Sequence, residues 1–341
     1  METPAIPAGV FFHQGLNDYV THTVTFALST HWNACQHTTG ESLVEEILTT
    51  TGLSVLELGY DVTLDLVPGI MRMVAEKAIR VDSVHNFCPV PVGAPFGHPE
   101  LFVLASLDRR TRDSAVRHTT STIEFAARVG AKVVVCHAGN VNMTRYTRRL
   151  VQLALADKIH TPKFERIRTK LIAKREKRVP PYLEYLTAGI EALLPVLEGN
   201  GVALAFENLP TWESIPTEIE IERICRHFNS PYVRAWHDIG HGRIRQNLGF
   251  TAQKHWIGKL APWLAGFHVH DVIPPAQDHV MPPDGAVDFA ALAPVLPPGA
   301  LLVLEPAPRT PAHLIRQAVE ILNVAWPAPA LPSPAPPETA P

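Results

Sequence analysis

Ionisable side chains close several apolar stretches in the second half of this 341-residue chain. VALAFE ends on Glu207, VRAWHD ends on Asp238, and LLVLE ends on Glu305. LAGFHVH carries His268 among its last residues. Carboxylates and imidazoles hold divalent metal ions and move protons in enzymes. The four side chains therefore predict a reactive site, if the fold brings these ends together.

The elements that must position them are short apolar runs that alternate with amphipathic stretches. Eight runs read as buried strands: 25–30, 53–59, 80–85, 131–137, 202–207, 233–238, 264–270 and 301–305. Strict alternation of strands and helices implies parallel strands joined by right-handed crossovers. Eight such units predict a single-domain (β/α)8 barrel. The alternative is an open doubly wound sheet, but STHWNACQHTTGE, after the first strand, lacks the Gly-rich turn typical of that fold.

The region after the fourth strand is too long for one helix, so we expect an enlarged helical insertion over 141–199, interrupted at Pro180 and Pro181. Between Arg145 and Arg178 it holds 12 Lys and Arg against 3 Asp and Glu. Such a stretch is typical of a solvated helical face, although an anion-binding or subunit-contact surface remains open. The whole chain has a net charge of −3, which gives no reason to expect a polyanionic partner.

The two ends of the chain differ from the rest in composition. We expect an N-terminal extension over 1–22, the barrel over 23–325, and a disordered Pro/Ala-rich tail over 326–341. METPAIPAGVFF lacks the features of a signal peptide, and no apolar run is long enough to cross a membrane. The four cysteines have no CxxC spacing, which favours free thiols in a reducing compartment. The prediction is a cytoplasmic protein without a membrane partner.

In a (β/α)8 barrel the carboxyl ends of the strands meet on one face. Glu207, Asp238 and Glu305 would then crowd three like charges together, which raises carboxylate pKa values unless a cation is present. Taken singly, a glutamate could pair with an arginine, and a histidine is more often structural. Taken together, three carboxylates and one imidazole predict a single divalent ion: Mn, Mg, Co or Zn.

Five segments, in order, resemble the xylose isomerase-like barrel superfamily, specifically its sugar phosphate isomerase/epimerase members: FENLP, WHDIGHG, FHVHDV, DHVMPPDGAVDF and VLEPAP. The endonuclease IV type of DNA-repair enzyme belongs to the same superfamily. The resemblance spans about residues 23–325. It implies four metal ligands: Glu207, Asp238, His268 and Glu305. The residues expected near substrate are Glu57, His85, His137, Asn208, His241, Arg243 and His270. His85 and His137 match positions that bind further zinc in the endonuclease branch, and His241 would contact substrate or a further metal.

The resemblance implies a metal-dependent sugar or sugar phosphate isomerase or epimerase. Glu207 and Glu305 would remove and return a proton α to a carbonyl, and the metal would stabilise the enediolate. The same site could instead serve a lyase or dehydratase acting on a keto-sugar or keto-glycoside, or a barrel that only binds a sugar. We expect a small sugar-like substrate and no nucleic acid, and we leave a homo-oligomer open.

A multi-zinc phosphodiesterase acting at abasic sites in DNA is the rival from another class. The basic stretch and His85, His137 and His241 favour it. The endonuclease pattern Asp-x-His is missing, however, because Asp278 and His279 are adjacent.

Overall fold

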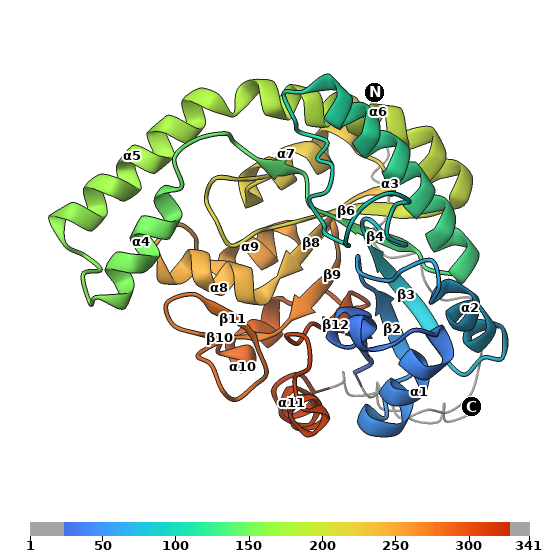
Figure 1. The fold of residues 1–341 in the computed structure, drawn as a ribbon. Coiled ribbons are helices and arrows are strands. Elements are labelled where there is room, and N and C mark those ends of the chain that lie inside the picture. Colours follow the sequence, from blue (N-terminus) through green and yellow to red (C-terminus); the bar gives the residue numbers. More distant parts are fainter. Residues whose placement is uncertain (1–23, 328–341) are drawn as a thin grey trace, which may run out of the picture.

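Eight parallel strands close into a barrel in the computed structural model, which describes residues 24–327 (Figure 1). The strands are β1 (Phe26–Ser29), β2 (Val55–Leu58), β3 (Arg80–His85), β4 (Val133–Cys136), β6 (Ala203–Glu207), β8 (Val233–Asp238), β9 (Leu264–Val269) and β12 (Leu301–Leu304). β1 closes the barrel by pairing with β12 on one side and β2 on the other. The predicted (β/α)8 barrel and all eight predicted strands are confirmed, and the open sheet is excluded.

Helices follow the strands and cover the outside of the barrel (Figure 1). They are α1 (Gly40–Thr51), α2 (Val67–Ala75), α3 (Arg109–Val129), α6 (Pro180–Asn200), α7 (Glu218–Phe228), α8 (Ile239–Asn247), α9 (Gln253–Leu260), α10 (Phe289–Leu292) and α11 (Ala312–Ala325). Short 3-10 helices cover Thr30–Trp32, Ala34–Gln36 and Ala293–Val295. α3 ends at Gly130, whose φ of 87° lies in the left-handed region that favours glycine.

The predicted insertion after the fourth strand is present and has two parts. α4 (Tyr146–Leu155) and α5 (Pro162–Arg178) form a hairpin that projects from one side of the barrel (Figure 1). Its own apolar core includes Leu150, Phe164 and Leu171, which cluster with Leu248. α6 instead packs against α3, as an ordinary barrel helix does. The extra structure is therefore the α4–α5 hairpin. The helical structure is interrupted just before Pro180, as predicted.

Two short antiparallel pairs lie outside the barrel sheet, and the sequence did not predict them. β5 (Gly139–Asn140) pairs with β7 (Ser214–Ile215), and β10 (Asp271–Ile273) pairs with β11 (Gln277–Val280). Each follows a barrel strand closely, so the pairs help to shape the face where the strands end.

Small side chains and one tryptophan fill the barrel interior. Ala27, Ala205 and Val303 belong to a cluster around the fully buried Trp236. A Cβ on Gly266 would lie 2.4 Å from the Trp236 ring, so glycine leaves the room that the indole needs. The interior is thus a packed core, and only its upper end, where the strands finish, is available for chemistry.

The boundary of the expected tail needs a correction of one residue. Trp326 is buried, its indole N–H donates to the Phe289 carbonyl at 2.7 Å, and its ring stacks near Phe26. Trp326 therefore belongs to the barrel. The expected extension over 1–22 and the rest of the tail, from 328 onward, lie outside the described residues. The four cysteines are free, as expected. No helix between residues 24 and 327 is long and apolar enough to span a membrane.

Candidate metal centre and active site

Four side chains from consecutive strands of the C-terminal half meet at the carboxyl end of the barrel. Glu207 and Asp238 are the last residues of β6 and β8, His268 lies near the end of β9, and Glu305 directly follows β12. All four are at most 5% exposed. Above them opens a cavity of about 300 Å³, to which Glu207 and Glu305 contribute side chains. The sequence prediction that these strand ends converge is confirmed by the fold.

His268 lies at the centre of this group. Its Nδ1 is 3.3 Å from Glu207 Oε1, 3.3 Å from Glu305 Oε2 and 3.8 Å from Asp238 Oδ2. Its Nε2 is 3.0 Å from Glu57 Oε1. Because a carboxylate only accepts hydrogen bonds, Glu57 fixes the proton of the neutral ring on Nε2. With that tautomer, Nδ1 presents a lone pair toward three carboxylates, a donor set that suits a divalent cation, whereas a protonated Nδ1 would donate to them instead.

The pKa directions reflect this crowding of charge. Burial opposes the charged form of His268, but Glu305, Glu57 and Glu207 outweigh it and raise the pKa of His268 well above its usual value. Burial also opposes ionisation of Glu207, yet His268 and His137 hold the Glu207 pKa well below its ordinary range. The pKa of Glu305 is raised, mainly by burial.

Glu57 was expected near substrate, and the structure places it elsewhere. It is fully buried beneath His268, and its second oxygen accepts a hydrogen bond from the Ser83 hydroxyl at 2.8 Å. Glu57 is not among the residues that line the cavity. It therefore orients His268, which is a common arrangement behind metal-binding imidazoles.

Asp238 is held from two sides. Its Oδ1 accepts the His241 backbone N–H at 2.6 Å, which caps α8, and its Oδ2 is 3.0 Å from His270 Nε2. The amide of Asn208 donates to the Asp238 carbonyl at 3.0 Å and accepts the Asp238 N–H at 2.9 Å. Asn208 and His270 thus lie behind the carboxylate and are not part of the cavity lining, although both were expected near substrate.

His85 and His137 lie on the other side of Glu207, in the cavity wall. Their Nε2 atoms are 3.5 Å and 3.0 Å from the same atom, Glu207 Oε2. The two histidines and Glu207 form a group whose ligand atoms all lie within 4.8 Å of one another. Glu207 is therefore shared between this group and the group around His268.

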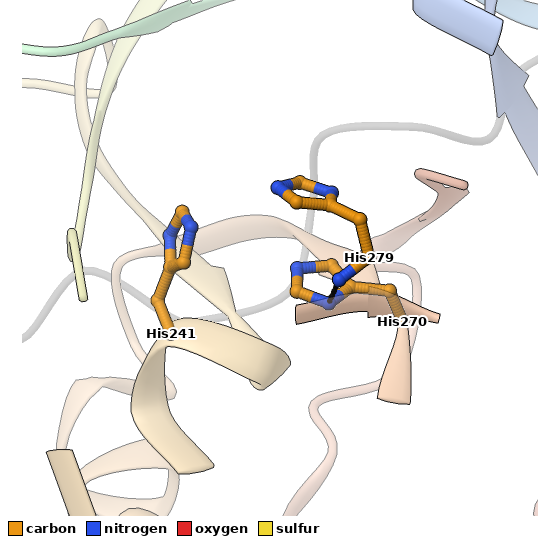
Figure 2. A group of neighbouring side chains, drawn as sticks. All are labelled: His241, His270 and His279. Atoms are coloured by element: carbon orange, nitrogen blue, oxygen red, sulfur yellow. Dashed lines mark hydrogen bonds between the residues drawn. The ribbon is translucent and has the colours of Figure 1, made fainter. Parts of the chain in front are cut away.

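Three further histidines gather beside Asp238. His241 comes from α8, His270 follows β9 and His279 comes from β11 (Figure 2). The rings of His270 and His279 stack at 4.2 Å, and the His279 N–H donates to His270 Nδ1 at 3.0 Å. Burial opposes the charged form of His241, but Asp238 and Glu207 outweigh it and raise the pKa to about 9. Burial and its histidine neighbours lower the pKa of His279 to about 3.

Only some of the residues that the sequence placed near substrate line the cavity. His85, His137 and His241 line it as expected, whereas the structure does not bring Arg243 into the lining. Sequence reasoning missed several lining residues that come from loops or from the short strands outside the barrel: Tyr60, His98, Glu100, Asn140, Arg145 and His279. The adjacent Asp278 and His279 were a usable signal for His279. The others carry no local pattern that marks them.

A larger surface groove, of about 870 Å³, lies between α6 and α7. Its two buried charges, Arg175 and Glu220, are paired with each other at 2.7 Å. The ion pair neutralises both charges, so neither buried group in this groove is an unpaired charge.

The family described as xylose isomerase-like TIM barrel matches residues 78–324. No curated protein sequence matches the chain. Among solved structures, a D-tagatose 3-epimerase-like protein is 17% identical and superposes with a TM-score of 0.62, covering 88% of this chain and 99% of its own. D-allulose 3-epimerase from Methylomonas sp., in complex with D-allulose, is 11% identical with a TM-score of 0.62, covering 89% and 98%. The IolI protein with a bound zinc atom is 13% identical with a TM-score of 0.57, covering 89% and 96%. At these identities the likeness establishes the fold.

Proposed function

The chain belongs to the xylose isomerase-like TIM barrel family, and from that premise we propose that it is a divalent-metal-dependent sugar isomerase or epimerase. The observation that carries the proposal is the position of His268 Nδ1, within 3.8 Å of three buried carboxylates. Solved structures of sugar epimerases share the fold, which supports the substrate class.

The donor set fits a single divalent ion. Glu207, Asp238, His268 and Glu305 would hold it, with Glu57 keeping the His268 lone pair turned toward it. Three carboxylates and one imidazole suit Mn, Mg, Co or Zn, and they leave coordination positions for substrate oxygens. When bound, the ion supplies positive charge that stabilises an enediolate.

Glu207 and Glu305 are the proposed proton-transfer groups. Both line the cavity, so both can face a substrate carbon next to a carbonyl. One carboxylate removes the proton from that carbon, and a carboxylate then returns it. Return to the opposite face of the same carbon gives an epimer, and return to the neighbouring carbon gives an aldose–ketose isomer.

The size of the cavity supports a small substrate. A volume of about 300 Å³ lies at the lower end of the range for ligand pockets, roughly 300–1,000 Å³. It suits one sugar unit better than a long glycoside. A lyase acting on a small keto-sugar would use the same residues, with a leaving group departing from the carbon next to the carbanion.

A second candidate, a multi-zinc phosphodiesterase, is favoured by a specific observation. Two further groups of ligand-type side chains flank the central one: His85, His137 and Glu207 on one side, and His241, His270 and His279 on the other. Such groups could hold additional ions. Metal analysis of the purified protein separates the two candidates, because the isomerase predicts about one ion per chain and the phosphodiesterase predicts two or three zinc ions.

The function itself is tested by solvent-deuterium exchange into sugars, followed by NMR. D-Allulose, D-tagatose, D-fructose, L-ribulose and their phosphates are incubated with the metal-loaded protein in D₂O. We expect exchange at a carbon next to the carbonyl in at least one sugar, and its loss after chelation. Absence of exchange in the whole panel, together with cleavage of DNA containing abasic sites, would replace the first candidate by the second.

A further inference from the structure

A chain of three polar side chains reaches the cavity from the side opposite the histidine-rich loops. The hydroxyl of Tyr60, which lines the cavity, is 3.2 Å from Nε2 of His31. Nδ1 of His31 is 3.0 Å from Asp61 Oδ2. The edge of the Tyr60 ring packs against His85, with 5.2 Å between ring centroids. None of these three residues has a role in the function proposed above.

The direction of these hydrogen bonds follows from the chemistry of the groups. The carboxylate of Asp61 accepts only, so Nδ1 of His31 carries a proton and donates it. In the neutral ring Nε2 is then an acceptor, and the Tyr60 hydroxyl donates to it. The only proton of the hydroxyl is thus committed to His31, and the Tyr60 oxygen presents lone pairs to the cavity. A substrate hydroxyl is the partner that such an oxygen accepts from.

The backbone holds the three residues close together. His31 lies in the 3-10 helix Thr30–Trp32 after β1, and Tyr60 and Asp61 lie in the loop after β2. The Gly59 N–H donates to the Thr30 hydroxyl at 2.8 Å. A Cβ on Gly59 would lie 2.8 Å from Asp61 Oδ1 and 3.1 Å from the backbone nitrogen of His31. Glycine at 59 therefore allows the two loops to approach, which sets the arrangement before substrate binds.

We propose that Tyr60 is a further catalytic residue, which exchanges a proton with a substrate oxygen and uses His31, oriented by Asp61, as the proton reservoir. This inference rests on the proposed function and makes it more specific. Epimerisation of an α-hydroxy ketone moves only a C–H proton. Aldose–ketose isomerisation must also move an O–H proton between neighbouring oxygens. A group dedicated to O–H protons therefore favours isomerisation.

The relay neither gains nor loses a proton over the complete reaction. After a carboxylate has removed the C–H proton, the enediolate has one negative oxygen and one hydroxyl. The hydroxyl proton passes to the Tyr60 oxygen while the Tyr60 proton passes to His31 Nε2, so one substrate O–H bond breaks and one N–H bond forms. The same path in reverse delivers a proton to the former carbonyl oxygen. The carboxylate proton goes to the neighbouring carbon, and Tyr60 and His31 return to their starting states.

The surroundings of His31 suit a proton acceptor. The titratable groups that act on it are Tyr60 and Asp61 from the β2 loop, Glu305 after β12, and His85 at the end of β3. Burial lowers the pKa of His31, but the hydrogen bond and charge of Asp61 outweigh burial, so the net pKa is raised. Neutral His31 is the competent acceptor, and activity should fall as the pH drops through its pKa.

The test compares two rates in one sample: deuterium exchange at carbon and aldose–ketose interconversion of the sugar that the wild-type protein exchanges fastest. In Tyr60→Phe we expect interconversion to fall about 100-fold or more. Carbon exchange should fall less than about tenfold, because the carboxylates remain. Tyr185→Phe, on the exposed side of α6, is the matched control and should change neither rate.

Asp61→Asn gives an independent test that does not depend on Tyr60→Phe folding. Removing the charge lowers the pKa of His31, so the acid limb of the interconversion rate should move to lower pH. An unmoved limb would overturn the relay, and so would equal losses of both rates in Tyr60→Phe or no loss at all. A wild-type protein that exchanges and epimerises without interconverting aldose and ketose would overturn the relay and leave the proposed function standing. A wild-type protein without exchange would overturn both.

Discussion

Glu57→Gln is the change that most sharply tests how the centre is organised. Glu57 Oε1 lies 3.0 Å from His268 Nε2, and the Glu57 side chain is fully buried. Hydrogen bonds to charged groups are worth about 1.5–3 kcal/mol, which corresponds to about 10- to 100-fold in a binding constant. Substitutions behind metal ligands have effects of the same size. We therefore expect Glu57→Gln to weaken divalent-metal binding by about 10- to 100-fold without changing the number of ions bound.

The assay is competition for Zn²⁺ or Mn²⁺ with a chelator of known affinity. Glu46→Gln is the matched control, because Glu46 pairs with His37 Nε2 at 2.7 Å, away from the cavity lining. The control should bind metal as the wild-type protein does. Unchanged metal affinity in Glu57→Gln would refute the argument that Glu57 turns the His268 lone pair toward the ion.

Three further predictions concern catalysis, pH and packing. Glu207→Gln and Glu305→Gln should each lower solvent-deuterium exchange into substrate by about 10²–10⁴-fold, as measured by NMR, and exchange at the wild-type rate in either would refute its role. Burial alone would raise the pKa of Glu220, but its pairing with Arg175 outweighs burial and lowers it. The stability that this pair contributes is therefore present above the unfolded pKa, near about 4.3, and is lost as the pH falls through the lower folded pKa. Glu220→Gln should lower the free energy of unfolding by about 3–5 kcal/mol at neutral pH, and it should weaken the dependence of that free energy on acidic pH, as measured by urea denaturation. A loss under about 1 kcal/mol would contradict this expectation. Deleting residues 327–341 should leave the Tm nearly unchanged, while Trp326→Ala should cost about 3–5 kcal/mol; equal effects of the two changes would show that the boundary is misplaced.

The sequence was sufficient for the barrel and for the central four residues because both depend on periodic patterns. Apolar runs such as VVVC and LLVL define buried strands, and the charged residue at the end of a run lies at the carboxyl end of the barrel. The same reasoning gives the direction of a side chain but not its depth. The family resemblance placed Glu57 near substrate, although it lies one layer below, under His268.

Loop residues escaped prediction for a different reason. Tyr60 and His31 are 29 positions apart and meet only because two loops approach at Gly59. No pattern in the local sequence indicates that these two residues come into contact. The α4–α5 hairpin was expected as part of a longer insertion, because its charged surface does not reveal that α6 packs on α3. Trp326 follows a helix and precedes a proline, so composition alone assigned it to the tail.

The most direct measurement is an anomalous-scattering map from crystals grown with Mn²⁺ or Zn²⁺. We expect one strong peak bonded to carboxylate oxygens of Glu207, Asp238 and Glu305 and to Nδ1 of His268. A fully occupied ion elsewhere, with these four side chains unligated, would contradict it.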